Sequence, residues 1–224
     1  MKIYKYTPYN EQAIENVKNH ELWFSSEFED DPKDNNLPIG DFNDDKFLES
    51  SIELFKQYPE IYEKFEKIFQ DNQISIDSNQ AFSVKDMMKT LKATYHGLTC
   101  FTTNESNQYM WKKFAKNHSG LCLCFETDFD KDFFKELYPV VYEKKLSMID
   151  LMDKDLPSQM KKYTTTKRIK FKPEDEIRLF KHKSGLHKYK SESLIEISMG
   201  RFFKDCKNLE NMITTFYNHE ILIK

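Results

Sequence analysis

Two glutamates and an arginine late in the chain are the residues whose types and spacing most readily support chemistry. Within the segment Phe171–Phe180, Glu174, Glu176 and Arg178 are spaced two residues apart, so an extended backbone would project all three from one face of a strand. Two carboxylates and a guanidinium are costly to bury unpaired. Residue type alone favours an exposed strand face with a Glu/Arg pair. The alternative is a carboxylate held at a strand end, where it could orient a sugar hydroxyl or stabilise a cation.

A second group of candidate residues lies in the segment Cys100–Glu126, which has the pattern of a strand, a polar turn, a short amphipathic helix and another strand. Thr102 and Thr103 end the first strand. Trp111 and His118 lie off the narrowest apolar face of the helix, which Ser-Gly should end. His118 is a candidate acid or base, or alternatively a residue that serves the helix C-terminus. We expect these side chains to form one wall of a pocket.

Apolar periodicity predicts the elements that must position these residues. The predicted strands are Lys2–Tyr6, Leu22–Phe24, Leu98–Phe101, Leu121–Phe125, Val140–Tyr142, Glu176–Phe180 and Leu194–Met199. The predicted helices are Asn10–Asn19, one or two in Phe47–Phe69, Phe82–Tyr95, Asn107–His118, Phe129–Leu137, Ser147–Tyr163 and Leu209–Phe216. Strands at both ends with helices inserted between them indicate an α+β fold with small, mostly antiparallel sheets. We expect one domain over residues 1–224, with a helical insertion at about 46–95.

Charge and composition exclude few functions. The net charge of the 224 residues is −3, which gives no whole-protein attraction to nucleic acid. A basic stretch from Lys161 to Lys172, extended as far as Lys190, is best interpreted as a solvated face, with nucleic-acid phosphates as the alternative partner. No metal site is predicted from the cysteines, because Cys122 and Cys124 alternate on a strand and the histidines lack ligand spacing.

The same survey predicts a cytoplasmic protein with no membrane partner. No apolar run approaches the ~20 residues that span a bilayer. The N-terminal residues lack the apolar core of a signal peptide. Four cysteines are too few for a disulfide framework, so reduced thiols are expected. The residues leave the oligomeric state open.

Several segments, in order, resemble a bacterial family known as the DUF2971 domain. Its Met-Trp, aromatic-Ala and His-x-Gly pattern corresponds here to Met110-Trp111, Phe114-Ala115, His118 and Gly120. The other similar segments are Tyr4–Tyr6, Leu22–Asp34, Pro139–Lys145, Lys167–Arg178 and Leu194–Gly200. The chain departs from the family at Asp30, where Asn is usual, at Lys33-Asp34, where Phe-Glu is usual, and at Phe114, where Tyr is common. The Glu-x-Glu-x-Arg segment recurs in the family, which favours a functional role for it.

The order of these segments is also similar to the layout of ADP-ribosyltransferases, which use NAD. That resemblance implies a basic residue on the first strand, a hydroxyl-bearing strand end against the nicotinamide ribose, and a late Glu that polarises a ribose hydroxyl and stabilises an oxocarbenium-like ribose. The implied catalytic residues are Glu176, Glu174, Arg178 and His118. The implied NAD-binding residues are Tyr4, Lys5 (for the pyrophosphate), Tyr6, Thr102, Thr103 and Trp111, with Tyr6 or Trp111 stacking on nicotinamide. Lys5 stands where that superfamily has Arg or His.

The implied partners are a small-molecule nucleotide and a protein or nucleic-acid acceptor, and the implied role is that of a toxin or antiphage effector. Two other classes of function stay open. Asp30, Asp31 and Asp34, with Glu174 and Glu176, could supply the oxygen ligands that Mg²⁺ prefers in a nuclease or phosphodiesterase. A non-catalytic interaction or sensor module is the third class.

Overall fold

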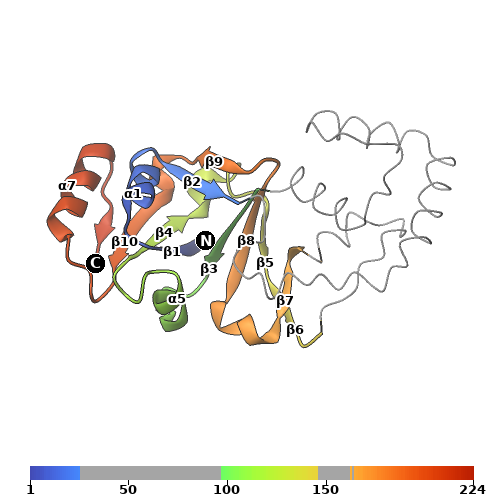
Figure 1. Ribbon diagram of the computed structural model, residues 1–224. Helices are drawn as coiled ribbons and strands as arrows, with labels where there is room; N and C mark the ends of the chain where they lie inside the picture. The colour runs from blue at the N-terminus through green and yellow to red at the C-terminus, as the bar shows by residue number, and fades with distance from the viewer. Residues whose placement is uncertain (26–96, 146–161, 163) are drawn as a thin grey trace, which may run out of the picture.

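The computed structural model of the chain describes residues 1–25, 97–145, 162 and 164–224 (Figure 1). They form a seven-stranded sheet with the order β11–β10–β4–β1–β3–β8–β5, antiparallel except for the parallel pair β10 and β11. Its strands are β1 (Lys2–Thr7), β3 (Gly97–Thr102), β4 (Leu121–Glu126), β5 (Leu137–Pro139), β8 (Glu176–Lys181), β10 (Leu194–Met199) and β11 (Leu222–Ile223). Strands from both ends of the chain share this sheet, so the predicted α+β class is confirmed.

Two smaller pairs of strands and a few short helices complete the described part. The antiparallel pair is β2 (Glu21–Phe24) with β9 (Gly185–Lys188), and the parallel pair is β6 (Val141–Glu143) with β7 (Thr166–Arg168). The α-helices are α1 (Glu11–Lys18), α5 (Gln108–Lys113) and α7 (Cys206–Phe216), and the 3-10 turns are η1 (Thr127–Asp130), η2 (Ile169–Glu174) and η3 (Ser191–Ser193). The side chains of Asn10 and Asn107 accept hydrogen bonds from backbone N–H groups of α1 and α5, which sets where both helices begin.

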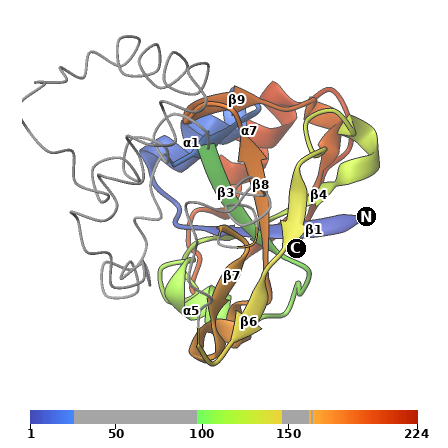
Figure 2. The ribbon, with the colours of Figure 1, turned by 90° about the vertical axis from the view of Figure 1, so that its right-hand side faces the viewer.

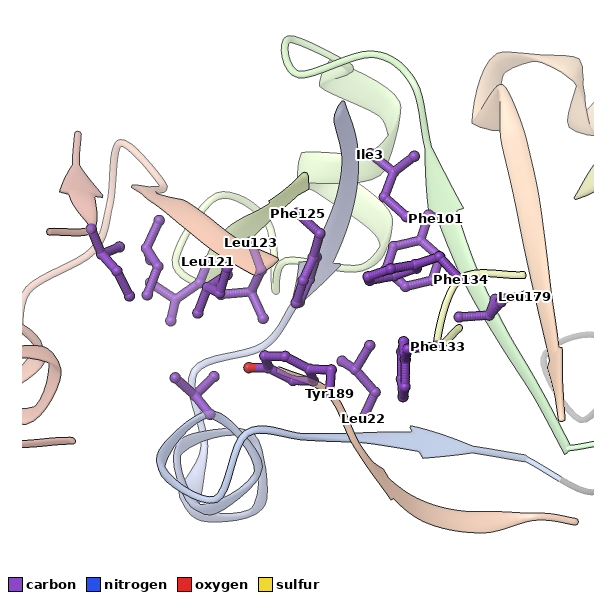
Figure 3. Packing of buried hydrophobic residues seen from close by; sticks show 14 of the residues in the cluster. Ile3, Leu22, Phe101, Leu121, Leu123, Phe125, Phe133, Phe134, Leu179 and Tyr189 are labelled. Carbon is purple, nitrogen blue, oxygen red and sulfur yellow. The ribbon is translucent and has the colours of Figure 1, made fainter. Parts of the chain in front are cut away.

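One face of the large sheet carries the main hydrophobic core. Apolar side chains from β1, β3, β4, β8 and β10 project from this face, as the period of two requires. In Figure 3, Phe101 and Phe125 lie opposite Phe133, Leu22 and Tyr189, which come from outside the sheet. Helices α1 and α7 add buried residues to the same cluster, so they cover this face.

The opposite face of the sheet is more polar, and α5 covers part of it. Tyr4, Tyr6, Cys122 and Cys124 project from β1 and β4 toward Met110, Trp111 and Ala115 of the α5 segment, in a second and smaller apolar cluster. Beside this cluster, β6, β7 and η2 lie next to β8 and α5 (Figure 2). This polar face contains most of the predicted functional residues.

Three predicted elements are corrected by the structure. The helix predicted to run to His118 ends at Lys113, because the backbone turns left-handed at Lys116, Asn117 and His118 (φ of 47°, 53° and 65°). The helix predicted at Phe129–Leu137 is instead the 3-10 turn η1, further turns and β5. Here Phe133 and Phe134 reach the core from turns, so their spacing imitates a helical period.

The third correction concerns Glu174. The sequence predicts it on the strand with Glu176, but it ends the 3-10 turn η2, and the strand begins at Glu176. Pro173 lies inside η2 and cannot donate a strand hydrogen bond, and Asp175 is left-handed with a φ of 47°. The helices predicted at Phe47–Phe69, Phe82–Tyr95 and Ser147–Tyr163 lie outside the described residues. Among the helices that are described, none is long and apolar enough to span a membrane.

Candidate functional site

Strands from three distant parts of the chain lie side by side in the middle of the sheet. Tyr4 of β1 pairs with Thr102 of β3, and Thr102 pairs with Glu176 of β8. Paired residues of neighbouring strands project from the same face, so these three side chains form a row, called here the Tyr4–Thr102–Glu176 row. Within the described residues this is the one register pair between β1 and β3. The row therefore lies where the two halves of the sheet join.

The row ends in a group of five charged side chains, of which Glu174, Glu176 and Arg178 are buried. It is called here the carboxylate cluster: Lys113, Lys167, Glu174, Glu176 and Arg178. Glu174 accepts from Lys113 Nζ at 2.8 Å and from Lys167 Nζ at 2.5 Å. Glu176 accepts from Lys167 Nζ at 2.9 Å and from Arg178 Nε at 2.7 Å. Lys167 therefore joins the two carboxylates. The expectation of an exposed strand face is wrong, because Glu174 and Glu176 are 1% and 4% exposed.

Neighbouring polar groups complete the surroundings of Glu176. Its backbone N–H donates to the hydroxyl of Tyr142 at 2.8 Å, and its carbonyl accepts from Val140 N at 2.9 Å. The thiol of Cys100 lies against its carboxylate, and burial raises the pKa of that thiol. Arg178, whose Nε binds Glu176, also donates to the carbonyl of Thr164. These contacts hold the carboxylate in one orientation on the sheet.

The charges of the cluster decide its ionisation. Burial by itself would raise the pKa of Glu176, but the positive charges of Arg178 and Lys167 outweigh it and hold that pKa at about 2. Burial would lower the pKa of Lys167, and the two carboxylates raise it instead. Glu176 is therefore an anion and Lys167 a cation throughout the neutral range.

This ionisation makes a pH-dependent contribution to stability, which the variant Glu176→Gln isolates. Because the pKa of Glu176 lies near 4.5 in the unfolded chain and at about 2 in the folded one, its contribution is present above pH 4.5 and is lost as the pH falls toward 2. The wild type should exceed Glu176→Gln by about 3 kcal/mol in free energy of unfolding at pH 7. Urea titrations at pH 7, 5, 4 and 3 should show this difference shrinking. A difference that stays constant would contradict the assignment.

Lys5, the predicted partner of a pyrophosphate, lies on the opposite face of the sheet from Glu176. It alternates with Tyr4 along β1, and its Nζ donates to Thr99 Oγ1 at 2.7 Å and lies 5.5 Å from the centre of the Phe101 ring in the main core. The structure thus brings Tyr4, Thr102 and Glu176 together and leaves Lys5 apart. Thr103, on the exposed loop after β3, donates to Asp175 Oδ2 at 2.7 Å.

Tyr6, Trp111 and His118 form an aromatic group beside the row. The rings of Tyr6 and Trp111 meet edge to face at 5.0 Å, and those of Trp111 and His118 stack at 6.0 Å with 12° between their planes. Burial, together with the charge of Arg201, lowers the pKa of His118, so its imidazole is neutral at pH 7. The rings of Trp111 and His118 thus stack on each other, which gives both residues a role in packing.

Backbone approaches around this aromatic group explain part of the Met-Trp…His-x-Gly pattern. A Cβ on Gly120 would lie 2.3 Å from the carbonyl oxygen of Thr7 in β1, so glycine is required for that approach. Ala115 is fully buried against the same glycine. These residues fix α5 against the sheet, and α5 in turn carries Lys113 to Glu174.

Sequence reasoning missed two members of the cluster, Lys113 and Lys167. A buried carboxylate needs a cationic partner, so the sequence could indicate that such partners exist. Which lysines they are depends on tertiary pairing, which local patterns do not specify. The three acidic residues of the alternative magnesium site, Asp30, Asp31 and Asp34, lie outside the described residues. Within the described part, no group of three or more His, Cys, Asp or Glu side chains is placed to hold a metal ion.

Comparisons of the chain with protein-family models, with curated proteins and with solved structures find no significant match. The resemblance to the DUF2971 domain therefore stays a prediction from the sequence.

Proposed function

We propose that the chain is an ADP-ribosyltransferase-like enzyme that takes NAD as its donor substrate at the Tyr4–Thr102–Glu176 row. The observation that carries this proposal is the juxtaposition of those three side chains on adjacent strands. They are an aromatic ring, a hydroxyl and an ionised carboxylate, and they are 8%, 0% and 4% exposed. These are the groups that would contact nicotinamide, hydrogen-bond a ribose and stabilise a cationic sugar.

Glu176 has the properties that the chemistry asks of a carboxylate. In the proposed reaction the bond between ribose C1′ and the nicotinamide nitrogen breaks, its electron pair leaves with neutral nicotinamide, and positive charge develops on the ribose. Water or an acceptor hydroxyl then bonds to C1′ and releases a proton. A carboxylate with a pKa of about 2 is already ionised and stabilises that charge without a prior proton transfer.

Lys113 and Lys167 replace Lys5 as the cations proposed to meet the pyrophosphate, because both lie on the same face of the sheet as Glu176. Their side chains are 34% and 21% exposed, so each reaches solvent. Both oxygens of Glu176 are engaged, by Arg178 and by Lys167. A ribose hydroxyl can therefore bind Glu176 once Lys167 releases it, and the second bond of Lys167, to Glu174, gives the displaced ammonium a partner.

The proposal is tested by incubating the purified protein with NAD, with and without a bacterial lysate as a source of acceptors. Chromatography should detect released nicotinamide, and NAD labelled on the adenylate should leave its label on an acceptor. EDTA should not reduce either signal, since no metal takes part in the proposed step. Detection of neither nicotinamide nor a labelled product would overturn the proposal. An EDTA-sensitive cleavage of phosphodiesters would favour the nuclease alternative instead.

A further inference from the structure

Lysine ammonium groups are unusually concentrated around one buried aromatic ring beside the carboxylate cluster. The Nζ atoms of Lys170, Lys167 and Lys113 lie 4.7, 4.9 and 5.3 Å from the centre of the Phe171 ring. These lysines come from η2, β7 and α5, so the ring joins three elements of the fold. Glu174 and Glu176 compensate part of this charge, and with Arg178 the group keeps an excess of cations.

More basic side chains extend this positive region across the surface. Elements α5, β6, β7 and η2 and the turns next to them expose further cations, which together with Lys170 are called here the basic surface: Lys112, Lys116, Lys144, Lys145, Lys162, Arg168, Lys170 and Lys172. The carboxylates on these elements and turns are Glu105, Glu143, Glu174, Asp175 and Glu176, of which Glu174 and Glu176 are buried. Because the whole chain has a net charge of −3, this positive excess is balanced by carboxylates elsewhere in the chain.

An aromatic side chain lies among these cations. Tyr109 on α5 is 36% exposed, and Lys113 Nζ lies 5.7 Å from the centre of its ring. Lys112 and Lys116, on and just after the same helix, are exposed as well. Cations that follow a phosphate backbone, interleaved with an aromatic ring on which a base can stack, are the features of surfaces that bind single-stranded nucleic acid.

We propose that the basic surface binds single-stranded nucleic acid, with the lysines on the phosphates and Tyr109 against a base. The inference stands independently of NAD chemistry. If both proposals hold, the bound strand would lie beside Glu176 as an acceptor. Stacking on Tyr109 favours a nucleic acid over an anionic membrane, because a lipid headgroup offers charge without a base.

The test is fluorescence anisotropy of a labelled 20-nucleotide single-stranded DNA of mixed sequence with the full-length protein, at salt concentrations from 50 to 200 mM. Binding should weaken as salt rises, because each phosphate contact releases counterions. The triple variant K112Q/K116Q/K172Q should bind about tenfold more weakly or worse, with a shallower salt slope. Tyr109→Ala should bind the single strand several-fold more weakly and change duplex binding less.

The matched control is K131Q/K135Q/K207Q, which removes the same charge from exposed lysines away from the basic surface. It should bind like the wild type. Equal losses in the two triple variants would show an unspecific charge effect and overturn the proposal. Binding to phosphatidylserine vesicles without binding to the oligonucleotide would also overturn it, in favour of a membrane surface. Nicotinamide release from NAD without added nucleic acid should be the same in all these variants, so failure of one proposal is distinguishable from failure of the other.

Discussion

Replacing Lys167 by methionine is expected to lower the free energy of unfolding by about 3 kcal/mol. The ammonium of Lys167 lies between Glu174 and Glu176, at 2.5 and 2.9 Å. Without it, one oxygen of each buried carboxylate loses its partner, and the two like charges face each other. Methionine keeps the length of the stem over Phe171, so the loss reports on charge. Urea denaturation at pH 7 measures it.

An exposed ion pair provides the matched control for this prediction. Lys18 donates to Glu15 at 2.7 Å on the surface of α1, and Lys18→Met should change the stability by less than about 1 kcal/mol. The double variant K167M/E174Q should recover part of the loss caused by Lys167→Met, because one of the facing charges is gone. If Lys167→Met were as stable as the wild type, the ion pairs of Lys167 with Glu174 and Glu176 would not stabilise the carboxylate cluster.

The parts of the fold with clean apolar periods could be predicted from the sequence. The strands β1, β4, β8 and β10 alternate or run continuously apolar between turn residues, and each lies close to its predicted position. By contrast, β9 (Gly185–Lys188) has no such pattern and forms by pairing with β2. The two-residue strand β11 likewise depends on β10. Elements that depend on a partner far along the chain leave little local signal.

The same distinction applies to the site. Glu176, Arg178 and Thr102 could be predicted as candidate site residues, because each is a polar residue at or near a strand end among apolar residues. Which strands are adjacent follows from the sheet order, which local patterns do not specify. The assignment of Lys5 to the same site as Tyr4 and Tyr6 is wrong, and local reasoning could have avoided it. The period of two along a strand places Lys5 on the opposite face from both tyrosines. Lys113 and Lys167 required the tertiary structure.

The second large effect is expected in catalysis. If Glu176 stabilises a cationic ribose, Glu176→Gln should slow nicotinamide release from NAD by about a hundredfold or more, because an amide keeps the shape but loses the charge. The amide NH2 group also cannot accept one of the two hydrogen bonds that the carboxylate accepts from Arg178 and Lys167. Lys5→Met changes a lysine on the opposite face of the sheet and should retain the rate within a few-fold. Circular dichroism of each variant confirms that the folded fraction is comparable.

Nicotinamide release by the wild type, Glu176→Gln and Lys5→Met, measured side by side at pH 7, is the most direct test of the assignment of the Tyr4–Thr102–Glu176 row. The assignment predicts release by the wild type and by Lys5→Met, and a loss of about a hundredfold in Glu176→Gln. Undiminished release by a folded Glu176→Gln protein, or a loss confined to Lys5→Met, would contradict it.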